Sequence, residues 1–237
     1  MARLNQRNIL IVGARTGIGA EIAHMAQREG ASLWTYGRQN PDPTLGHWAF
    51  WDAVGDVDFP VDHLPEEIHG LVYAPGSITL KPFNRLTDAD YLNEWKLNFL
   101  GAARAARAVY SRLKKASSSS VVFMSTVATQ TGMPFHSSIA SAKSALEGLT
   151  RSLAAESAAS GIRVNALAPS LTDTPLAASL LNSEEKRLAG DKRHPLGRVG
   201  TPRDTAAAAI FLLAPESGWI TGQIIGVDGG MGSLRGI

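Results

Sequence analysis

Short apolar runs alternate along this chain with longer segments in which apolar residues recur every three or four positions. The first run, residues 8–12, reads NILIV and stops at Gly13, which is typical of a strand buried on both faces of a parallel sheet. Residues 17–29 have helical spacing and end at Gly30, a residue type that favours helix C-termini. The start of the chain therefore predicts a strand followed by a helix.

The same alternation continues to the end of the chain. Strands are predicted at residues 31–36, 47–51, 70–74, 121–125, 162–168 and 224–227, and helices at residues 88–113, 137–160 and 202–214. Strands that alternate with helices favour one doubly wound parallel sheet, the α/β arrangement called the Rossmann fold. No linker, repeat or change of composition divides the sequence, so residues 1–237 are expected to form a single domain.

The connection between the second and third predicted strands is unusually short. Only ten residues, 37–46, separate these strands, and they include Pro41 and Pro43. A helical crossover needs at least about 10–12 residues with a formed helix, and two prolines oppose one. We therefore expect the helix between strands two and three to be shortened or absent.

Composition narrows the function classes. The 237 residues include no cysteine, which excludes disulfides, thiolate metal sites and a cysteine nucleophile, and no metal is expected. The 23 Lys and Arg residues against 21 Asp and Glu give a net charge of +2 without a basic run, so nucleic acid is not an expected partner. The longest stretch without charge, residues 116–142, contains many polar side chains, so no membrane span is expected. The expected compartment is the cytoplasm.

A glycine-rich loop joins the first predicted strand to the first helix. Its sequence is Gly13-Ala14-Arg15-Thr16-Gly17-Ile18-Gly19. Glycines at such a turn let the backbone approach a pyrophosphate, and the helix N-terminus that follows offers unpaired N–H groups to the anion. At this place in the chain, the loop predicts a dinucleotide-binding site.

The end of the second predicted strand indicates which dinucleotide is bound. It reads Tyr36-Gly37-Arg38 and lacks the carboxylate that would bind the ribose hydroxyls of NAD. Arg38, together with Arg15 in the glycine loop, carries a guanidinium group suited to binding a 2′-phosphate in a fork. NADP is therefore expected rather than NAD.

Five stretches, in this order, resemble the short-chain dehydrogenase/reductase superfamily and extend over nearly the whole chain. They read VGARTGIG, KLNFLGA, VVFMSTVA, SIASAKSALEGLTRSLAAE, and NALAPSLTDTP with the closing ITGQIIGVDGGM. The resemblance implies a Rossmann fold, a bound nicotinamide dinucleotide and an oxidoreductase activity.

The same resemblance implies a set of cofactor-binding positions. In the family, Asp52 would lie beside the adenine and Lys143 would hold the nicotinamide ribose. The family's Asn-Asn-Ala-Gly turn is replaced here by Tyr73-Ala74-Pro75-Gly76, which removes a contact that braces the sheet. The expected cofactor-binding residues are Gly13, Arg15, Thr16, Gly17, Ile18, Gly19, Arg38, Trp51, Asp52, Ala74, Gly76, Lys143, Pro169, Thr172 and Thr174.

The family's active site contains an asparagine, a serine, a tyrosine and a lysine. Asn98 and Lys143 match the first and the last, and Thr126 takes the serine position, where its hydroxyl would bind a substrate carbonyl. The tyrosine should lie four residues before the lysine, but that position is Ile139, which cannot donate a proton. The chain's four tyrosines lie elsewhere.

Three interpretations of the missing acid follow. In the first, His136 replaces it: this histidine lies seven residues before Lys143, the wider spacing of the related enoyl-thioester reductases, and an imidazole can protonate an enolate or alkoxide near neutral pH. In the second, the substrate is protonated with little help from the protein, or the proton comes from Ser125, Thr126, Ser138 or water. In the third, the chain binds NADP without turnover.

The first hypothesis for function is an NADPH-dependent reduction of a carbonyl or conjugated double bond in a small or acyl substrate. Its catalytic residues would be Asn98, Thr126, Lys143 and His136. The alternative is a noncatalytic NADP-binding regulatory or structural subunit. Residues 175–195 take the position of the family's substrate lid, and the alanine-rich helices after Gly101 and Lys143 resemble its helix-pair interface. A homotetramer is therefore expected, with a dimer as the next possibility.

Overall fold

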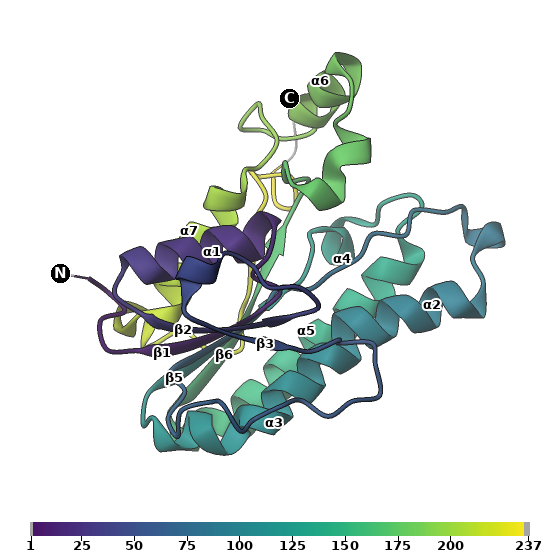
Figure 1. Cartoon of the computed structure of the whole chain (residues 1–237). Helices are drawn as coiled ribbons and strands as arrows, with labels where there is room; N and C mark the ends of the chain where they lie inside the picture. Colours follow the sequence, from purple (N-terminus) through teal and green to yellow (C-terminus); the bar gives the residue numbers. More distant parts are fainter. Residues whose placement is uncertain (1, 235–237) are drawn as a thin grey trace.

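Seven parallel strands form one sheet in the order β3-β2-β1-β4-β5-β6-β7 (Figure 1). The structure is a computed structural model that describes residues 2–234; residue 1 and residues 235–237, which the predicted domain includes, lie outside the described residues. The predicted doubly wound sheet is confirmed. The strands are β1 (Asn8–Val12), β2 (Ser32–Gly37), β3 (His47–Phe50), β4 (Gly70–Tyr73), β5 (Ser119–Met124), β6 (Ile162–Pro169) and β7 (Ile224–Val227).

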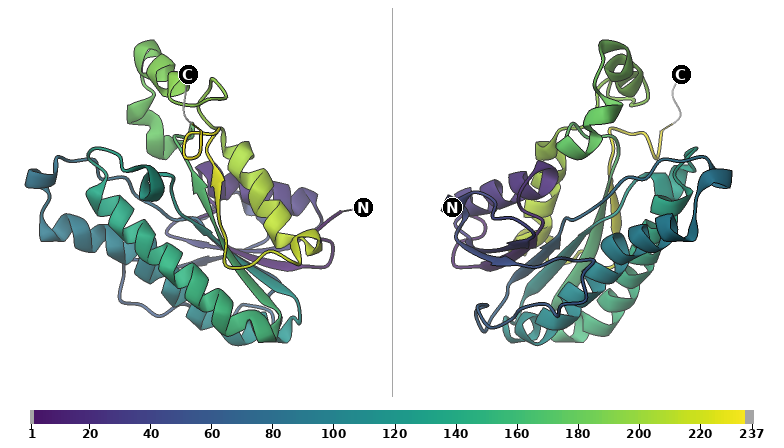
Figure 2. Two further views of the ribbon diagram at one scale, coloured as in Figure 1. Left: turned by 180° about the vertical axis from the view of Figure 1, so that it is seen from behind. Right: turned by 45° about the vertical axis from the view of Figure 1, so that its right-hand side comes forward.

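Helices cover both faces of this sheet, as the two views in Figure 2 show. Strand β1 illustrates why, because its successive side chains point to opposite faces. Leu10 and Val12 belong to one buried core, whereas Ile9 and Ile11 belong to the other. The first core lies under α3 (Gly101–Lys115) and α5 (Ser137–Ser157), and the second under α1 (Gly17–Arg28) and α7 (Pro202–Leu213).

The edge of the sheet near β3 has little helical cover. A single 3-10 turn, Pro43–Leu45, connects β2 to β3, as the proline-containing connection predicts. The Asp42 carboxylate accepts a hydrogen bond from the Thr44 N–H at 2.9 Å and caps this turn, while Leu45 packs into the core beneath α1. Residues 51–69, which lead from β3 back to β4, also contain no α-helix. Five of their apolar side chains belong to the core on this face of the sheet: Trp51, Ala53, Phe59, Leu64 and Ile68.

The backbone is helical throughout the segment expected at residues 88–113, but it is not a regular α-helix along its whole length. It divides into α2 (Asp88–Trp95), a π-helical turn at Lys96–Leu100, and α3. The Tyr73 hydroxyl, at the end of β4, donates a hydrogen bond to the Leu97 carbonyl oxygen at 2.6 Å. This bond ties the π-turn to the sheet, and Tyr73 therefore braces the strand end where the family's asparagine pair is missing.

Residues 175–195, the predicted lid, project beyond the carboxyl edge of the sheet (Figure 1). They form a 3-10 helix, Pro175–Leu180, and α6 (Glu184–Lys192). A further short helix, α4 (Ala128–Thr131), follows β5. Among residues 2–234, no helix is both long enough and apolar enough to cross a membrane.

Gly101 is expected to be indispensable for the tie between β4 and the π-turn. A Cβ at this position would collide with the Tyr73 hydroxyl, so Gly101→Ala should lower the free energy of unfolding by about 1–3 kcal/mol, the usual cost of overpacking. Urea denaturation measures this change. The loss should shrink in a Tyr73→Phe background, because the colliding oxygen is then absent.

Gly148 provides the matched control. It lies in the exposed part of α5, and a Cβ there would meet no atom within 4 Å. Gly148→Ala should therefore stabilise the protein by about 0.5–1 kcal/mol, because alanine is the better helix former. Equal effects of the two substitutions would contradict the role assigned to Gly101.

Candidate functional site

A cavity of about 630 Å³ opens at the carboxyl ends of β4, β5 and β6, beneath the lid segment. In a parallel α/β sheet this is where ligands bind, because the loops that leave the strands meet there. Of the predicted site residues, the structure brings nine to its wall: Ile18, Ala74, Gly76, Thr126, His136, Lys143, Pro169, Thr172 and Thr174. The other predicted residues lie behind this wall or beside it: Asn98 in the π-turn, and the rest in the glycine loop and at the ends of β2 and β3.

The glycine loop has the properties of an anion cradle. Gly13 and Gly17 have φ angles of +85° and +60°, a left-handed conformation that favours glycine. A Cβ at Gly19 would collide with the Gly13 carbonyl oxygen, so the turn closes tightly against α1. The Thr16 side chain does not cap this helix, and its first turn holds no acidic residue. The N–H groups at the start of α1 are thus free to bind a phosphate, and the loop fits a dinucleotide.

Two arginines lie beside this cradle. The Gly13 N–H donates a hydrogen bond to the Tyr36 carbonyl oxygen at 2.8 Å, which joins the glycine loop to the end of β2. Arg15 and Arg38 each lie two residues beyond these joined positions, and both side chains are exposed. Within residues 2–234 neither guanidinium forms an ion pair or a hydrogen bond with the protein.

The end of β3 offers less to a cofactor than the resemblance implies. The Trp51 side chain is buried in the core, where its ring meets that of Phe59 edge-on at 4.8 Å, so only its backbone can contact a ligand. One oxygen of the Asp52 carboxylate accepts a hydrogen bond from the Val54 N–H at 3.2 Å. This bond closes a turn and holds Asp52, which is half-buried, at the strand end.

Lys143 has a buried ammonium group that borders the cavity. Its Nζ donates a hydrogen bond to the Met124 carbonyl oxygen at 2.6 Å, and the side chain is only 6% exposed. Burial lowers the pKa of Lys143 from its usual 10.5 to about 8, against the opposing effect of the Glu94 carboxylate. A lysine with this pKa can exchange protons near neutral pH.

Glu94 forms the centre of a buried polar cluster behind the cavity wall. Its carboxylate accepts hydrogen bonds from the Ser77 hydroxyl at 2.6 Å, the Thr79 N–H at 2.9 Å and the Asn98 amide nitrogen at 2.6 Å. The π-turn carries Asn98 into this cluster, where its side chain is fully buried. Asn98 is thus held one turn from Glu94 and serves the carboxylate as a donor.

The other end of the Asn98 amide is left for a ligand. Its Oδ1 atom is buried without a hydrogen-bond partner among the described residues. A Cβ placed on Gly76 would lie 3.5 Å from this oxygen and 4.0 Å from Lys143 Nζ, so all three residues meet at one point of the site. An unpaired buried acceptor beside an ammonium group is suited to a water molecule or a ribose hydroxyl.

Thr126 and Ile139 lie on the wall where the family places its hydroxyl groups. Thr126 Oγ1 accepts a hydrogen bond from the Ala128 N–H at 3.3 Å, which leaves the hydroxyl hydrogen for a ligand. Ile139 is 4% exposed and presents only hydrocarbon to the cavity. The preceding Ser125 is not free, because it donates its hydrogen to the buried carboxylate of Glu147 at 2.6 Å. The wall therefore offers the Thr126 hydroxyl as donor and no phenol.

His136 borders the cavity one turn before Ile139. Its Nδ1 lies 2.7 Å from the Pro134 carbonyl oxygen. A carbonyl can only accept, so this nitrogen carries a hydrogen, and Nε2 is left as the atom that can gain or lose a proton. The ring is half-buried and thus in reach of both solvent and ligand.

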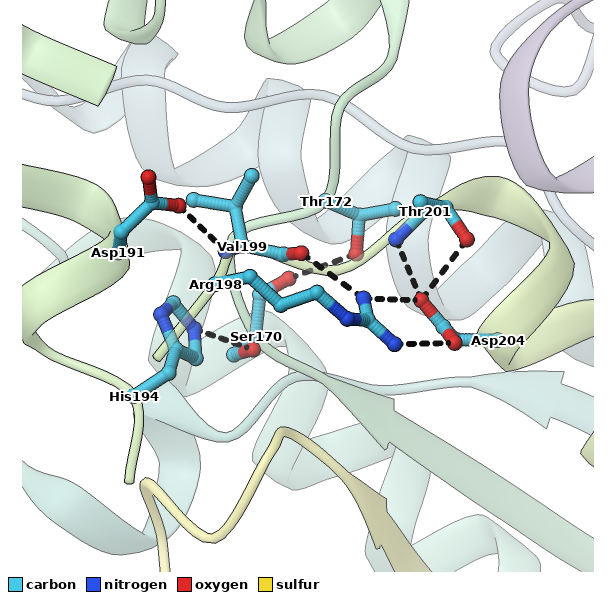
Figure 3. Close-up of polar contacts among 8 residues, drawn as sticks. All are labelled: Ser170, Thr172, Asp191, His194, Arg198, Val199, Thr201 and Asp204. Atoms are coloured by element: carbon cyan, nitrogen blue, oxygen red, sulfur yellow. Dashed lines mark hydrogen bonds and ion pairs between the residues drawn. The ribbon is translucent and has the colours of Figure 1, made fainter. Parts of the chain in front are cut away.

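A second histidine contacts the cavity wall through a serine (Figure 3). His194 is 3% exposed, and its Nδ1 lies 2.8 Å from the Gly190 carbonyl oxygen. Its Nε2 lies 2.8 Å from the hydroxyl of Ser170, a residue of the cavity wall. With the hydrogen on Nδ1, the Nε2 atom accepts a hydrogen bond from the Ser170 hydroxyl, and Ser170 lines the cavity.

Sequence reasoning missed Glu94 and His194. Glu94 lies four residues before Asn98, so helical spacing places the two side chains on one face and gives a signal that could have found it. His194 carries no such signal, because Ser170, the partner of its Nε2, lies 24 residues away and meets it only through the fold.

Comparisons with known proteins agree with this geometry. Residues 57–232 match the family model described as Enoyl-(Acyl carrier protein) reductase. A chloroplastic tropinone reductase homolog of Arabidopsis thaliana is 32% identical over 250 residues, which cover 98% of this chain and 77% of that protein.

Solved structures give the same result. The ligand-free aldohexose dehydrogenase of Thermoplasma acidophilum superposes with a TM-score of 0.93 at 26% identity, covering 100% of this chain and 98% of that one. A Beutenbergia cavernae structure described as an NAD(P)-dependent gluconate 5-dehydrogenase, with NADP bound at low occupancy, gives a TM-score of 0.86 at 27% identity; the match covers 96% of this chain and 97% of that one.

The charge of Glu94 is expected to control the proton affinity of Lys143. Because this carboxylate raises the pKa of Lys143, Glu94→Gln should lower that pKa below about 8. NMR titration of lysine Cε signals, assigned with a Lys143→Met variant, measures the shift. An unchanged Lys143 pKa in the folded Glu94→Gln protein would contradict the coupling.

Glu147→Gln is the matched control, because Glu147 is also buried and lies one helical turn from Lys143, yet it binds Ser125 and Thr129 instead. The pKa of Lys143 should not move in that variant.

The lowered pKa of Lys143 also fixes the sign of a pH effect on the free energy of unfolding. Between about pH 8 and pH 10.5 the unfolded chain binds more protons than the folded one, so stability should rise with pH in this window and not in Lys143→Met.

Proposed function

The chain belongs to the short-chain dehydrogenase/reductase superfamily, and on that premise we propose that it is an NADP(H)-dependent oxidoreductase that reduces a carbonyl or conjugated double bond of a small or acyl substrate. One observation carries the proposal. The cavity wall that holds Lys143 and Thr126 also holds Ile18, at the free N-terminus of α1, so a single ligand can span the phosphate cradle and the reaction site.

NADP is proposed over NAD because of the charges beside the cradle. Arg15 and Arg38 are exposed cations, and the end of β2 carries no carboxylate that would compete for them. The first-turn N–H groups of α1 would hold the pyrophosphate, and Thr172 and Thr174 border the cavity where the nicotinamide half would lie. The Beutenbergia structure with NADP supports this choice. When bound, the reduced nicotinamide supplies a hydride.

The remaining roles belong to the chain's own residues. Lys143 would bind the ribose hydroxyls, and its neighbour Asn98 would accept a hydrogen bond from water or ribose through its unpaired Oδ1. Thr126 would donate its hydroxyl hydrogen to the substrate oxygen. His136, protonated at Nε2, would transfer that proton to the alkoxide or enolate and recover one from solvent, while Pro134 holds Nδ1.

An apolar hollow on the surface supports a proposed assembly. Tyr91, Leu92, Trp95 and Ala145 line a shallow apolar hollow between α2 and α5, next to the alanine-rich α3. We propose that these helices pair with those of another copy in a homotetramer, with a dimer as the next possibility, in the cytoplasm. Analytical ultracentrifugation distinguishes these assemblies.

A noncatalytic NADP-binding subunit is the second candidate function, and Ile139 is the observation that favours it. A site that has lost its phenol can still bind the dinucleotide through the glycine loop and Lys143. Binding of NADPH without turnover of any ketone, enone or imine would support this function over the first.

Removal of either arginine should weaken NADPH binding selectively. Arg15→Ala and Arg38→Ala should each raise the Kd for NADPH about 10- to 100-fold, the range for a charge-assisted hydrogen bond, and leave the Kd for NADH nearly unchanged. Isothermal calorimetry measures both constants. Arg28→Ala is the control, because Arg28 lies at the other end of α1 and pairs with Glu21. Tighter binding of NADH than NADPH by the unaltered protein would refute the cofactor choice.

His136→Ala should lower kcat by about 10²–10⁴-fold, the usual contribution of a general acid. NADPH oxidation with ketone, enone and imine panels between about pH 6 and pH 8 measures the loss. Ile139→Tyr should restore ketone reduction in the His136→Ala background, because it places a phenol at the family's acid position. Unchanged kcat in His136→Ala would remove this residue from the mechanism.

A further inference from the structure

Two cationic side chains of the lid border the cavity. Lys186, Ala189 and Arg193 all contribute to its wall, and their spacing of three and four residues places them on one face of α6. The same helix buries Gly190 against Val199 and Leu171, which fixes the rotation of α6 toward the cavity.

Two arginines nearby are neutralised by carboxylates, but Lys186 and Arg193 are not, among residues 2–234. Arg187 pairs with Asp173 at 2.8 Å, and Arg198 forms a two-bond pair with Asp204 (Figure 3). Lys186 donates only to neutral acceptors, the Ser179 carbonyl oxygen and the Asn182 amide oxygen.

Arg193 has no hydrogen bond from its guanidinium to any atom of residues 2–234. Among residues 2–234, Lys186 and Arg193 therefore bring positive charge to the cavity without a carboxylate partner, whereas the paired Arg187 does not line the cavity.

The wall itself supplies no negative charge. Among the described residues that line the cavity there is no aspartate or glutamate, and the charged members are Lys143, Lys186 and Arg193. Two buried carboxylates, Glu94 and Glu147, lie behind the wall, and each accepts hydrogen bonds from the protein. The rest of the wall is largely apolar, with Ile78, Leu80, Met133, Ile139, Leu171 and Met231.

We propose that the substrate of this site is an organic carboxylate, with an apolar body against the hydrocarbon wall and its anionic end on Lys186 and Arg193. This inference rests on the proposed function and names its substrate class. A planar guanidinium binds a carboxylate in a fork, and a lysine beside it adds a second charge. The reducible group of the substrate would lie at the other end, beside Thr126 and Lys143.

Binding of matched probes to the NADP-loaded protein tests the proposal without turnover. Hexanoate and hexanamide have nearly the same shape and differ in charge, so calorimetry should show hexanoate binding about tenfold tighter or more, with a preference that fades at high salt. Arg193→Gln and Lys186→Gln should remove the preference. Equal affinity for the two probes, or no binding of hexanoate, would overturn it.

Two controls make the test specific. Arg187→Gln changes a neighbouring arginine that pairs with Asp173 outside the cavity, so it should leave the hexanoate Kd unchanged. The Kd for NADPH should also be the same in Arg193→Gln as in the unaltered protein. If Arg193→Gln raised the Kd for NADPH and left hexanoate binding unchanged, these cations would belong to the cofactor site and the proposal would be overturned.

Turnover separates this inference from the proposed function. If the chain is a reductase, NADPH oxidation should proceed with a lower KM for an oxo acid than for its methyl ester. Equal KM values would overturn the substrate class and leave the reductase function standing. Selective hexanoate binding with no NADPH oxidation by any substrate would support the anion site and reject the reductase.

Discussion

The charge of a buried ammonium group must be balanced by an opposite charge and by hydrogen bonds, and the groups that do this for Lys143 organise the carboxyl edge of this sheet. The Lys143 ammonium donates one hydrogen bond to the Met124 carbonyl oxygen, and the Glu94 carboxylate supplies the opposing charge. That carboxylate is itself buried and needs donors, which come from Ser77, Thr79 and Asn98. Each group is tolerated in the interior only because the others are present, since an isolated buried charge is costly.

The backbone is shaped to bring these groups together. Helical spacing places Asn98 on the same face as Glu94, and the π-turn widens the helix at that residue. Tyr73 holds the widened turn through the Leu97 carbonyl oxygen, and Gly101 makes room for the phenol. The aromatic residue at the strand end is thus part of the support for the site, although it lies outside the cavity.

The sequence predicts those features of the fold and the site that depend on neighbouring residues. The strands follow from short apolar runs, the cradle from glycines placed between a strand and a helix, and the single 3-10 turn after β2 from two prolines. The π-turn was missed because one extra residue per turn hardly disturbs apolar spacing. Glu94 has a local partner in Asn98, but its other two donors come from residues 77 and 79, and the Ser170 partner of His194 lies 24 residues away. The lid helix, residues 184–192, is mostly polar and exposed, so it gives almost no periodic signal.

The short connection after β2 also affects the entropy of ligand binding. Two prolines, together with a turn capped by Asp42, leave residues 37–46 with few conformations even before a ligand arrives. Arg38 lies at the start of this stiff segment. A longer loop would have to be ordered when a phosphate binds, at the expense of affinity. Here the loss of a helix leaves a short connection restricted by two prolines, so less conformational entropy is lost when Arg38 binds a phosphate.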